Sequence, residues 1–197
     1  MRKWQIGNVG RQCVTPFFSN MFLCRYVWRR DIVIGIRSFV MKNFFKFLLA
    51  IFISFVPGMI GVLFTPSHSN DQWYNALNNS VLTPDGWVFG VAWTILYTLL
   101  GIALFLVMNN EKTRRSKATA YVLFATQMGL NALWTYLFFG LHFVGGALLT
   151  LVALIAVSIW MASEFRVFNR WASRLVWPYI AWLLFAMYLN VTILWLN

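Results

Sequence analysis

The sequence predicts an all-α membrane protein, a bundle of five transmembrane helices with a cytoplasmic N-terminus. Of its 197 residues 60% are hydrophobic and 11% are charged, long stretches carry no charge, and the basic residues gather in short clusters between those stretches. Soluble domains carry about 25% charged residues. A chain of this length also has too small an interior to hide so much apolar surface from water, so lipid must cover the remainder.

The uncharged stretches predict the number of helices. Residues 47–70, 86–110, 118–163 and 175–197 form runs of 24, 25, 46 and 23 uncharged residues. About 20 apolar residues cross a bilayer. Three runs therefore hold one helix each, and the longest holds two, because three glycines between Gly140 and Gly146 break it. The predicted helices cover about 44–64, 88–109, 117–138, 145–163 and 173–195.

Basic residues in the connections predict the orientation. One side of the predicted bundle carries all of those that flank a helix: Lys42, Lys46, Lys112, Arg114, Arg115, Lys117, Arg166, Arg170 and Arg174. The segments on the other side, 65–87, 139–144 and the C-terminal end, carry none. The N-terminus and both basic loops are therefore expected in the cytoplasm, with the cell (inner) membrane as the default location. This distribution explains the net charge of +11 without a nucleic-acid partner.

Residues 1–40 differ from the rest of the chain. They hold seven Lys or Arg residues against one acid, Asp31, and no stretch long enough to span a membrane. We expect a basic extension at 1–40 followed by a five-helix transmembrane domain at 41–197. Two interpretations of the extension stay open: it is disordered, or the start of the chain is misassigned and the natural start is Met41. Cys13 and Cys24 are too isolated to suggest a disulfide framework or a metal site.

The connection between the first two predicted helices, residues 65–87, is longer than a simple link requires. Loops of this length are commonly lids or binding elements. Its rings Trp73, Tyr74 and Trp87 form either an interfacial aromatic belt or part of a lid over a pocket. Asp85 either caps the next helix or lies at the pocket mouth, and the capping role is the expected one.

Polar and aromatic side chains recur at helical spacing inside the predicted helices. Three sets each share one helix face: Trp93 and Tyr97; Gln127, Asn131 and Trp134; and Trp182, Ala186 and Asn190. Amide groups are costly in hydrocarbon unless they are bonded, so these faces should point into the bundle. There they either bond between helices or line a cavity together with the large rings. For Asn190 we expect interhelical hydrogen bonds.

Three stretches form a recognisable series. They are Pro84 with 87–97 (WVFGVAWTILY), 127–140 (QMGLNALWTYLFFG) and 177–190 (WPYIAWLLFAMYLN). In this order they resemble the tryptophan-rich sensory protein family, which includes the mitochondrial translocator protein, formerly the peripheral benzodiazepine receptor. The resemblance extends over residues 41–197.

This resemblance implies a five-helix bundle, usually a homodimer, with a ligand cavity beneath the loop that follows the first helix. It also implies a small hydrophobic ligand, a tetrapyrrole such as haem or protoporphyrin IX and in some members a sterol, with no cofactor required. Family members occur in plasma, outer and organelle membranes. The positions implied at the ligand are Leu82, Trp93, Tyr97, Gln127, Asn131, Trp134, Trp182 and Ala186, and those implied in the lid are Trp73, Tyr74, Pro84 and Asp85.

Three functions compete, and we prefer a membrane receptor or sensor that binds a tetrapyrrole and regulates stress or porphyrin handling. A transporter of porphyrins or sterol-like ligands is an alternative, although the chain shows no inverted internal repeat. The other alternative is an enzyme that degrades porphyrin in light. Leu82 argues against it, because leucine stands where the family has a second cavity tryptophan. The residues themselves offer no catalytic set and no metal-binding cluster.

Overall fold

The computed structural model describes residues 21–65, 72–78, 80, 82–111 and 113–197, with side chains from Val40 onward except those of Gln72 and Asn75. All regular structure within these ranges is helical. Its elements are α1 (Met21–Val62), α2 (Gln72–Ala76), α3 (Gly86–Met108), α4 (Ala118–Thr135), a π-helical turn η1 (Tyr136–Gly140), α5 (Val144–Phe168) and α6 (Arg170–Leu196). The chain divides into two compact units, Met1–Phe45 and Lys46–Asn197, and the packing and the site described below belong to the second.

Five segments of the described chain are long and apolar enough to cross a membrane. They are Val40–Val62, Gly86–Met108, Ala118–Gly140, Val144–Phe168 and Arg170–Leu196. The predicted five-helix, all-α transmembrane fold is therefore confirmed, and the chain is an integral multi-pass membrane protein.

The largest difference from the predicted boundaries is at the start of α1, which begins at Met21 and not near residue 44, while α5 extends to Phe168 instead of ending near 163. Hydropathy marks where a membrane span begins, whereas the start of a helix follows backbone propensity. Arginine, the commonest residue between 21 and 40, is a good helix former. Residues 1–20 of the predicted extension lie outside the described part of the chain.

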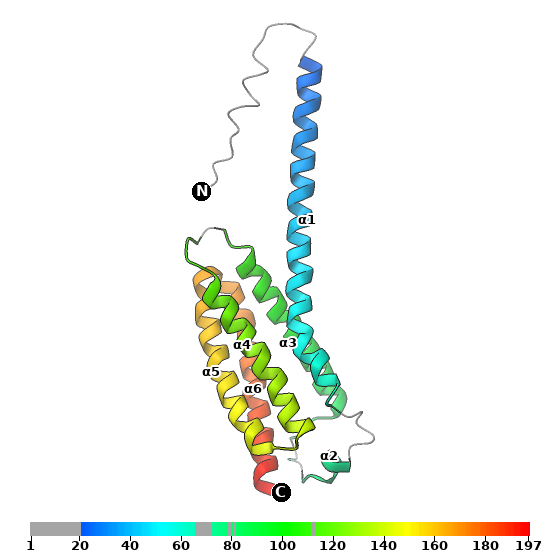
Figure 1. Ribbon diagram of the computed structural model, residues 1–197, viewed down its shortest axis with the longest axis vertical. Coiled ribbons are helices and arrows are strands. Elements are labelled where there is room, and N and C mark those ends of the chain that lie inside the picture. The colour runs from blue at the N-terminus through cyan, green and yellow to red at the C-terminus, as the bar shows by residue number, and fades with distance from the viewer. Residues whose placement is uncertain (1–20, 66–71, 79, 81, 112) are drawn as a thin grey trace. The chain divides into compact units, whose positions relative to one another are not determined.

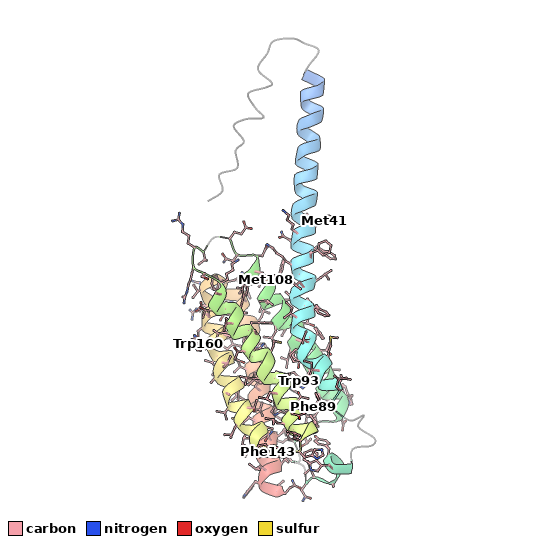
Figure 2. All side chains as sticks on the ribbon, viewed as in Figure 1. Met41, Phe89, Trp93, Met108, Phe143 and Trp160 are labelled. Carbon is pink, nitrogen blue, oxygen red and sulfur yellow. The ribbon has the colours of Figure 1, made fainter. Side chains whose placement is uncertain are left out.

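Helix α5 packs along both α4 and α6, and α6 also packs along α3 (Figure 1). Fully buried side chains such as Leu100, Leu154 and Leu183 fill the space between these helices. Large apolar side chains also cover the outward faces, as Trp160 does on α5 (Figure 2). In a membrane protein lipid covers such faces, which explains why large apolar side chains are exposed here.

Gly101 allows α1 to approach α3 closely. A Cβ atom at this position would lie 2.8 Å from the Ser54 hydroxyl oxygen and 2.9 Å from the Ile51 Cα atom. The fully buried Ser54 hydroxyl donates to the Ile51 carbonyl at 2.7 Å, so it needs no partner from water. Small residues commonly hold transmembrane helices together, because they let two backbones come into contact.

The two basic loops lie at one end of the bundle. Arg115, between α3 and α4, forms an ion pair of 3.1 Å with the buried Glu164 of α5. The Asn110 amide donates to the Phe168 carbonyl, and the Asn169 side chain caps α6 by accepting from two backbone N–H groups. The two loops are thus bonded to each other, as the predicted topology requires of loops on one side of a membrane. Their cytoplasmic location stays a prediction.

We predict that Gly101→Ala separates α1 from α3, because the added methyl group would meet the Ile51 Cα atom at 2.9 Å as well as the ends of the Ile51 and Ser54 side chains, and a backbone atom cannot turn aside. Overpacking of this kind destabilises by about 1–3 kcal/mol. The thermal unfolding midpoint in detergent measures the loss. Gly129→Ala is the matched control, because a Cβ there meets no atom within 4 Å. Equal midpoints for the two variants would contradict the close α1–α3 contact.

Candidate functional site: an aromatic cavity

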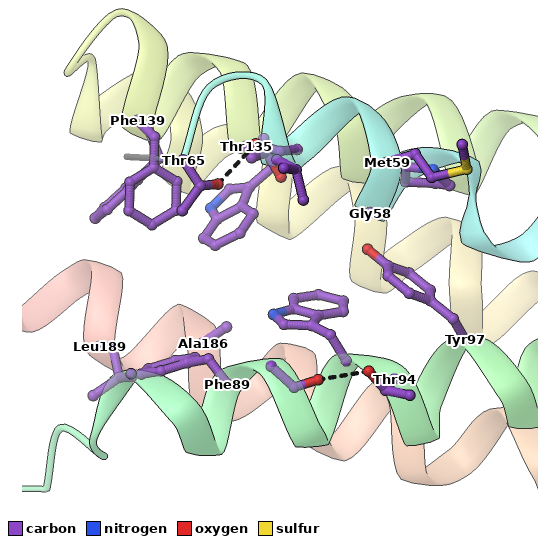
Figure 3. Close-up of a pocket in the computed structure, with 18 of the residues that line it drawn as sticks. Gly58, Met59, Thr65, Phe89, Thr94, Tyr97, Thr135, Phe139, Ala186 and Leu189 are labelled. Atoms are coloured by element: carbon purple, nitrogen blue, oxygen red, sulfur yellow. Dashed lines mark hydrogen bonds between the residues drawn. The ribbon is translucent and has the colours of Figure 1, made fainter. Parts of the chain in front are cut away.

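A cavity of about 500 Å³ lies between α1, α3, α6 and the segment formed by α4 and η1. This volume is within the range of cavities that bind small ligands. Figure 3 shows Met59 and Tyr97 at one end of the cavity and Phe139 and Leu189 at the other. The lining residues are Phe55, Pro57, Gly58, Met59, Gly61, Val62, Thr65, Tyr74, Gly86, Phe89, Gly90, Trp93, Thr94, Tyr97, Trp134, Thr135, Phe138, Phe139, Ala186, Leu189, Asn190 and Ile193.

Two glycines in the α1 wall lie close to residues of α3 and α4. A Cβ atom on Gly58 would lie 2.8 Å from the Tyr97 ring, and one on Gly61 would lie 3.3 Å from the Thr135 side chain. Pro57 beside them has no backbone N–H group to donate. Gly58 and Gly61 thus let α1 lie close to Tyr97 and Thr135, while Phe55 and Met59 supply larger side chains to the same wall.

Aromatic rings form a continuous cluster along the cavity wall. Trp93 stacks on Tyr97 with ring centres 5.3 Å apart, and its ring centre lies 6.3 Å from that of Trp134. Trp134 in turn stacks on Phe138 at 5.7 Å. Trp182 contacts Trp93 edge-on at 6.5 Å without lining the cavity. The wall therefore offers flat apolar faces to a ligand.

A hydrogen-bonded bridge connects three helices directly beside this wall. The Tyr97 hydroxyl of α3 donates to the Asn131 Oδ1 atom of α4 at 2.9 Å. The Asn131 Nδ2 atom donates to the Tyr179 hydroxyl of α6, also at 2.9 Å. All three side chains are buried, so both ends of the amide are satisfied inside the hydrocarbon region.

The segment around α2 contacts the Phe139 end of the cavity. Trp73 stacks on His142 with ring centres 4.0 Å apart, and Tyr74 contacts Phe139 at 5.9 Å. His142 has a positive φ of 53°, which reverses the chain between η1 and α5 and places its ring against Trp73. Tyr74 lines the cavity, and burial raises the pKa of its hydroxyl group, which is therefore neutral at physiological pH.

The residues after α2 are bonded to the C-terminal part of α6. The Asn78 N–H group donates to the Asn197 side-chain oxygen at 2.9 Å, and the Asn197 amide donates back to the Asn78 carbonyl at 3.3 Å. The Ser80 and Tyr188 hydroxyls lie 3.0 Å apart. These contacts fix the described part of the loop at the end of the bundle opposite the basic loops.

The cavity opens between α1 and α3. Four of its lining residues are also exposed on the outside of the bundle, Met59 and Val62 from α1 and Gly90 and Thr94 from α3. All four belong to membrane-spanning segments. The opening therefore lies within the part of the bundle that the lipid chains surround.

Comparison with known proteins agrees with this architecture. The TspO/MBR family matches residues 49–196. The chain belongs to this family. It is 37% identical over 155 residues to a tryptophan-rich protein TspO of Archaeoglobus fulgidus. The matched region covers 79% of the chain and 99% of that relative. It is 33% identical to a tryptophan-rich sensory protein of Cereibacter sphaeroides (75% and 92% covered) and 32% identical to the human translocator protein (60% and 71% covered). The family resemblance predicted from the three motifs is therefore confirmed. The family contains membrane sensor and translocator proteins.

Five of the residues predicted at the ligand or in the lid line the cavity of this TspO/MBR-family chain. They are Tyr74, Trp93, Tyr97, Trp134 and Ala186. The other predicted positions do not line it: Trp73, Leu82, Pro84, Asp85, Gln127, Asn131 and Trp182. Among these, Asn131 forms the bridge, Trp182 lies behind Trp93, and Leu82 is 63% exposed.

Two roles expected from the sequence are corrected by the structure. Asn190 is predicted to form interhelical hydrogen bonds, but its buried amide has no partner among the described residues, although the residue itself lines the cavity. Asp85 occupies the N-cap position of α3, yet its side chain makes no capping bond, and only its backbone carbonyl accepts, from Val88. Helical spacing gives the face of a residue but not whether a bonding partner lies within reach.

The α1 wall of the cavity is not predicted by the sequence pattern. Gly58 and Gly61 lie three residues apart on one helix face, which is a usable signal for close packing. No polar or ring pattern marks Pro57 as part of a binding wall. The spacing of polar and aromatic side chains predicts interior faces on α3, α4 and α6 but not on α1.

We predict that Tyr97→Phe destabilises the bundle by about 0.5–2 kcal/mol, because it leaves the Asn131 oxygen buried without its donor. The ring, and with it the cavity wall, is kept. Chemical or thermal unfolding in detergent measures the change. The exposed Tyr136 gives the control substitution Tyr136→Phe. If both substitutions lower stability equally, the bridge does not hold the helices together.

Proposed function

We propose that this protein is a membrane receptor or sensor that binds a flat, mostly apolar tetrapyrrole such as protoporphyrin IX or haem in its cavity, and thereby regulates stress or porphyrin handling. The observation that carries the proposal is the cavity of about 500 Å³ with a continuous aromatic wall. Flat apolar ligands gain contact energy by stacking on indole and phenol rings. Membership of a family of sensor and translocator proteins supports it.

The chemistry of the lining suits a porphyrin ring. No lining residue among those that the structure describes carries a formal charge. The ring therefore occupies the apolar part, beside Trp93 and Trp134, and its two carboxylates project toward the end near Tyr74 and Thr65, where the chain leaves the membrane. The described lining also contains no histidine or cysteine, so metal-free protoporphyrin IX is the better first probe.

The ligand enters from the bilayer through the opening between α1 and α3. Hydrophobic ligands partition into lipid before they meet the protein, and the exposed rim residues Met59 and Gly90 lie within membrane-spanning segments. The contacts of Trp73 with His142 and of Asn78 with Asn197 support a lid role for the segment around α2. A homodimer, implied by the family resemblance, and a sterol as an alternative ligand belong to the same proposal.

We predict that Ala186→Leu weakens binding of protoporphyrin IX at least about tenfold, because three added carbon atoms enter the cavity and displace the ring. Ala181→Leu on the exposed face of α6 is the matched control and should bind like the wild type. Quenching of tryptophan fluorescence in lipid nanodiscs, with empty nanodiscs subtracted, measures the affinity.

Two further readouts of the same titration separate the competing functions. Bleaching of the pigment in light that depends on the protein would support an enzyme, and uptake of porphyrin into sealed vesicles would support a transporter. Saturable quenching without either supports the receptor. Unsaturable quenching, or equal binding by both leucine variants, would contradict the proposed site.

A further inference from the structure

The first two turns of α6 carry a pair of arginines on the outward face of the helix. Arg170 and Arg174 are both exposed and lie four residues apart, so their side chains are neighbours on one face. Neither side chain has a carboxylate or hydrogen-bond partner among the described residues, and the buried Glu164 of α5 is already paired with Arg115. Two like charges at this spacing destabilise a helix, and an anion bound between them removes the repulsion.

Trp171 lies beside this pair and orders one of its members. The Arg174 guanidinium carbon lies 4.8 Å from the centre of the Trp171 ring, in a cation–π contact. The ring is 64% exposed, so a partner from outside the bundle can reach this contact. A ring against the guanidinium reduces its rotamer freedom, which lowers the entropy cost of binding an anion. The guanidinium N–H donors, whose geometry matches a phosphate group, stay unused.

The length of α6 places the arginine pair at the level of the lipid headgroups. The helix has 27 residues and is therefore about 40 Å long, whereas the hydrocarbon core of a bilayer is about 30 Å thick. Charged side chains avoid the hydrocarbon, so the first turns of the helix, with Arg170 and Arg174, extend into the headgroup layer. The exposed Trp177 follows one turn later, at the boundary where tryptophan is enriched in membrane proteins.

Beyond the arginine pair the same face of α6 is apolar. Trp177, Ala181 and Leu184 are exposed and follow Arg174 at helical spacing. The face therefore offers positive charge at headgroup depth and an apolar strip along the acyl chains. A phospholipid with a negative headgroup matches both parts. A free phosphate matches only the first part, and a phosphatidylcholine brings its own positive charge next to the arginines.

We propose that the exposed start of α6 is a binding site for one anionic phospholipid. Its residues are Arg170, Trp171, Arg174 and Trp177. The phosphate lies between the two arginines, and the acyl chains follow the outward face of the helix past Leu184. The bound lipid neutralises the arginine pair and fixes the depth of α6 in the bilayer. This site lies outside the cavity and does not depend on the proposed function.

Native mass spectrometry of the full chain tests the site. The protein is released from nanodiscs that contain equal parts of phosphatidylglycerol and phosphatidylcholine with identical acyl chains, and the lipids that stay bound are counted. The wild type should retain phosphatidylglycerol at least about tenfold more often than phosphatidylcholine, because each arginine at an anionic headgroup contributes about fivefold. The double variant Arg170→Gln/Arg174→Gln should lower this ratio at least about fivefold.

The chain offers a matched control and a second variant. Lys42→Gln/Arg114→Gln also removes two exposed basic residues but leaves α6 intact, so the ratio should change by less than about twofold. Trp171→Leu keeps both arginines and removes the ring against Arg174, so it should lower the ratio about two- to threefold. It also tests the inference if the double arginine variant does not fold.

Three results would overturn the inference. Equal loss of phosphatidylglycerol in the arginine variant and in the control would mean that net charge alone attracts anionic lipid. A wild type without a preference would mean that no such site exists. Displacement of the bound lipid by millimolar inorganic phosphate would assign the arginines to a soluble anion. None of these results concerns the cavity, so the proposed function is tested separately.

Discussion

The hydrogen-bonded bridge of Tyr97, Asn131 and Tyr179 is the interaction on which the rest of the structure depends. In the hydrocarbon region no water is present to bond an amide, so Asn131 must find both partners inside the protein. Its two bonds fix α3 and α6 relative to α4. One of the partners, Tyr97, also forms the cavity wall, so the same side chain fixes the helices and shapes the binding surface.

Close backbone contact complements this bridge. Gly101 brings α1 against α3, and Gly58 brings it against the Tyr97 ring. Where α1 continues as Pro57 and Gly61, it adds little volume, and space remains between it and the rings of Trp93 and Trp134. The cavity is thus enclosed by rings on α3 and α4 and by a wall of small and large residues on α1, and it opens toward lipid because the rim lies within the membrane spans.

The sequence was sufficient to predict the five spans, because long uncharged stretches are a direct consequence of the bilayer. It also predicted that Asn131 faces the interior and that Trp93, Tyr97, Trp134 and Ala186 belong to one region. It did not distinguish Asn131, which is bonded, from Asn190, which is not, because both lie on an interior face. That difference depends on the distance to Tyr97 and Tyr179, residues remote in sequence from Asn131, and no local pattern encodes it.

The central claim is that a flat ligand lies inside the bundle against Ala186. Methyl NMR of alanine-labelled protein in detergent tests it directly, because the ring current of a porphyrin shifts the resonances of methyl groups at its face. On addition of protoporphyrin IX the Ala186 methyl signal should move strongly, while that of Ala181 on the exposed face of α6 stays in place. A shift of Ala181 with an unchanged Ala186 would place the porphyrin on the lipid-facing surface and contradict the account.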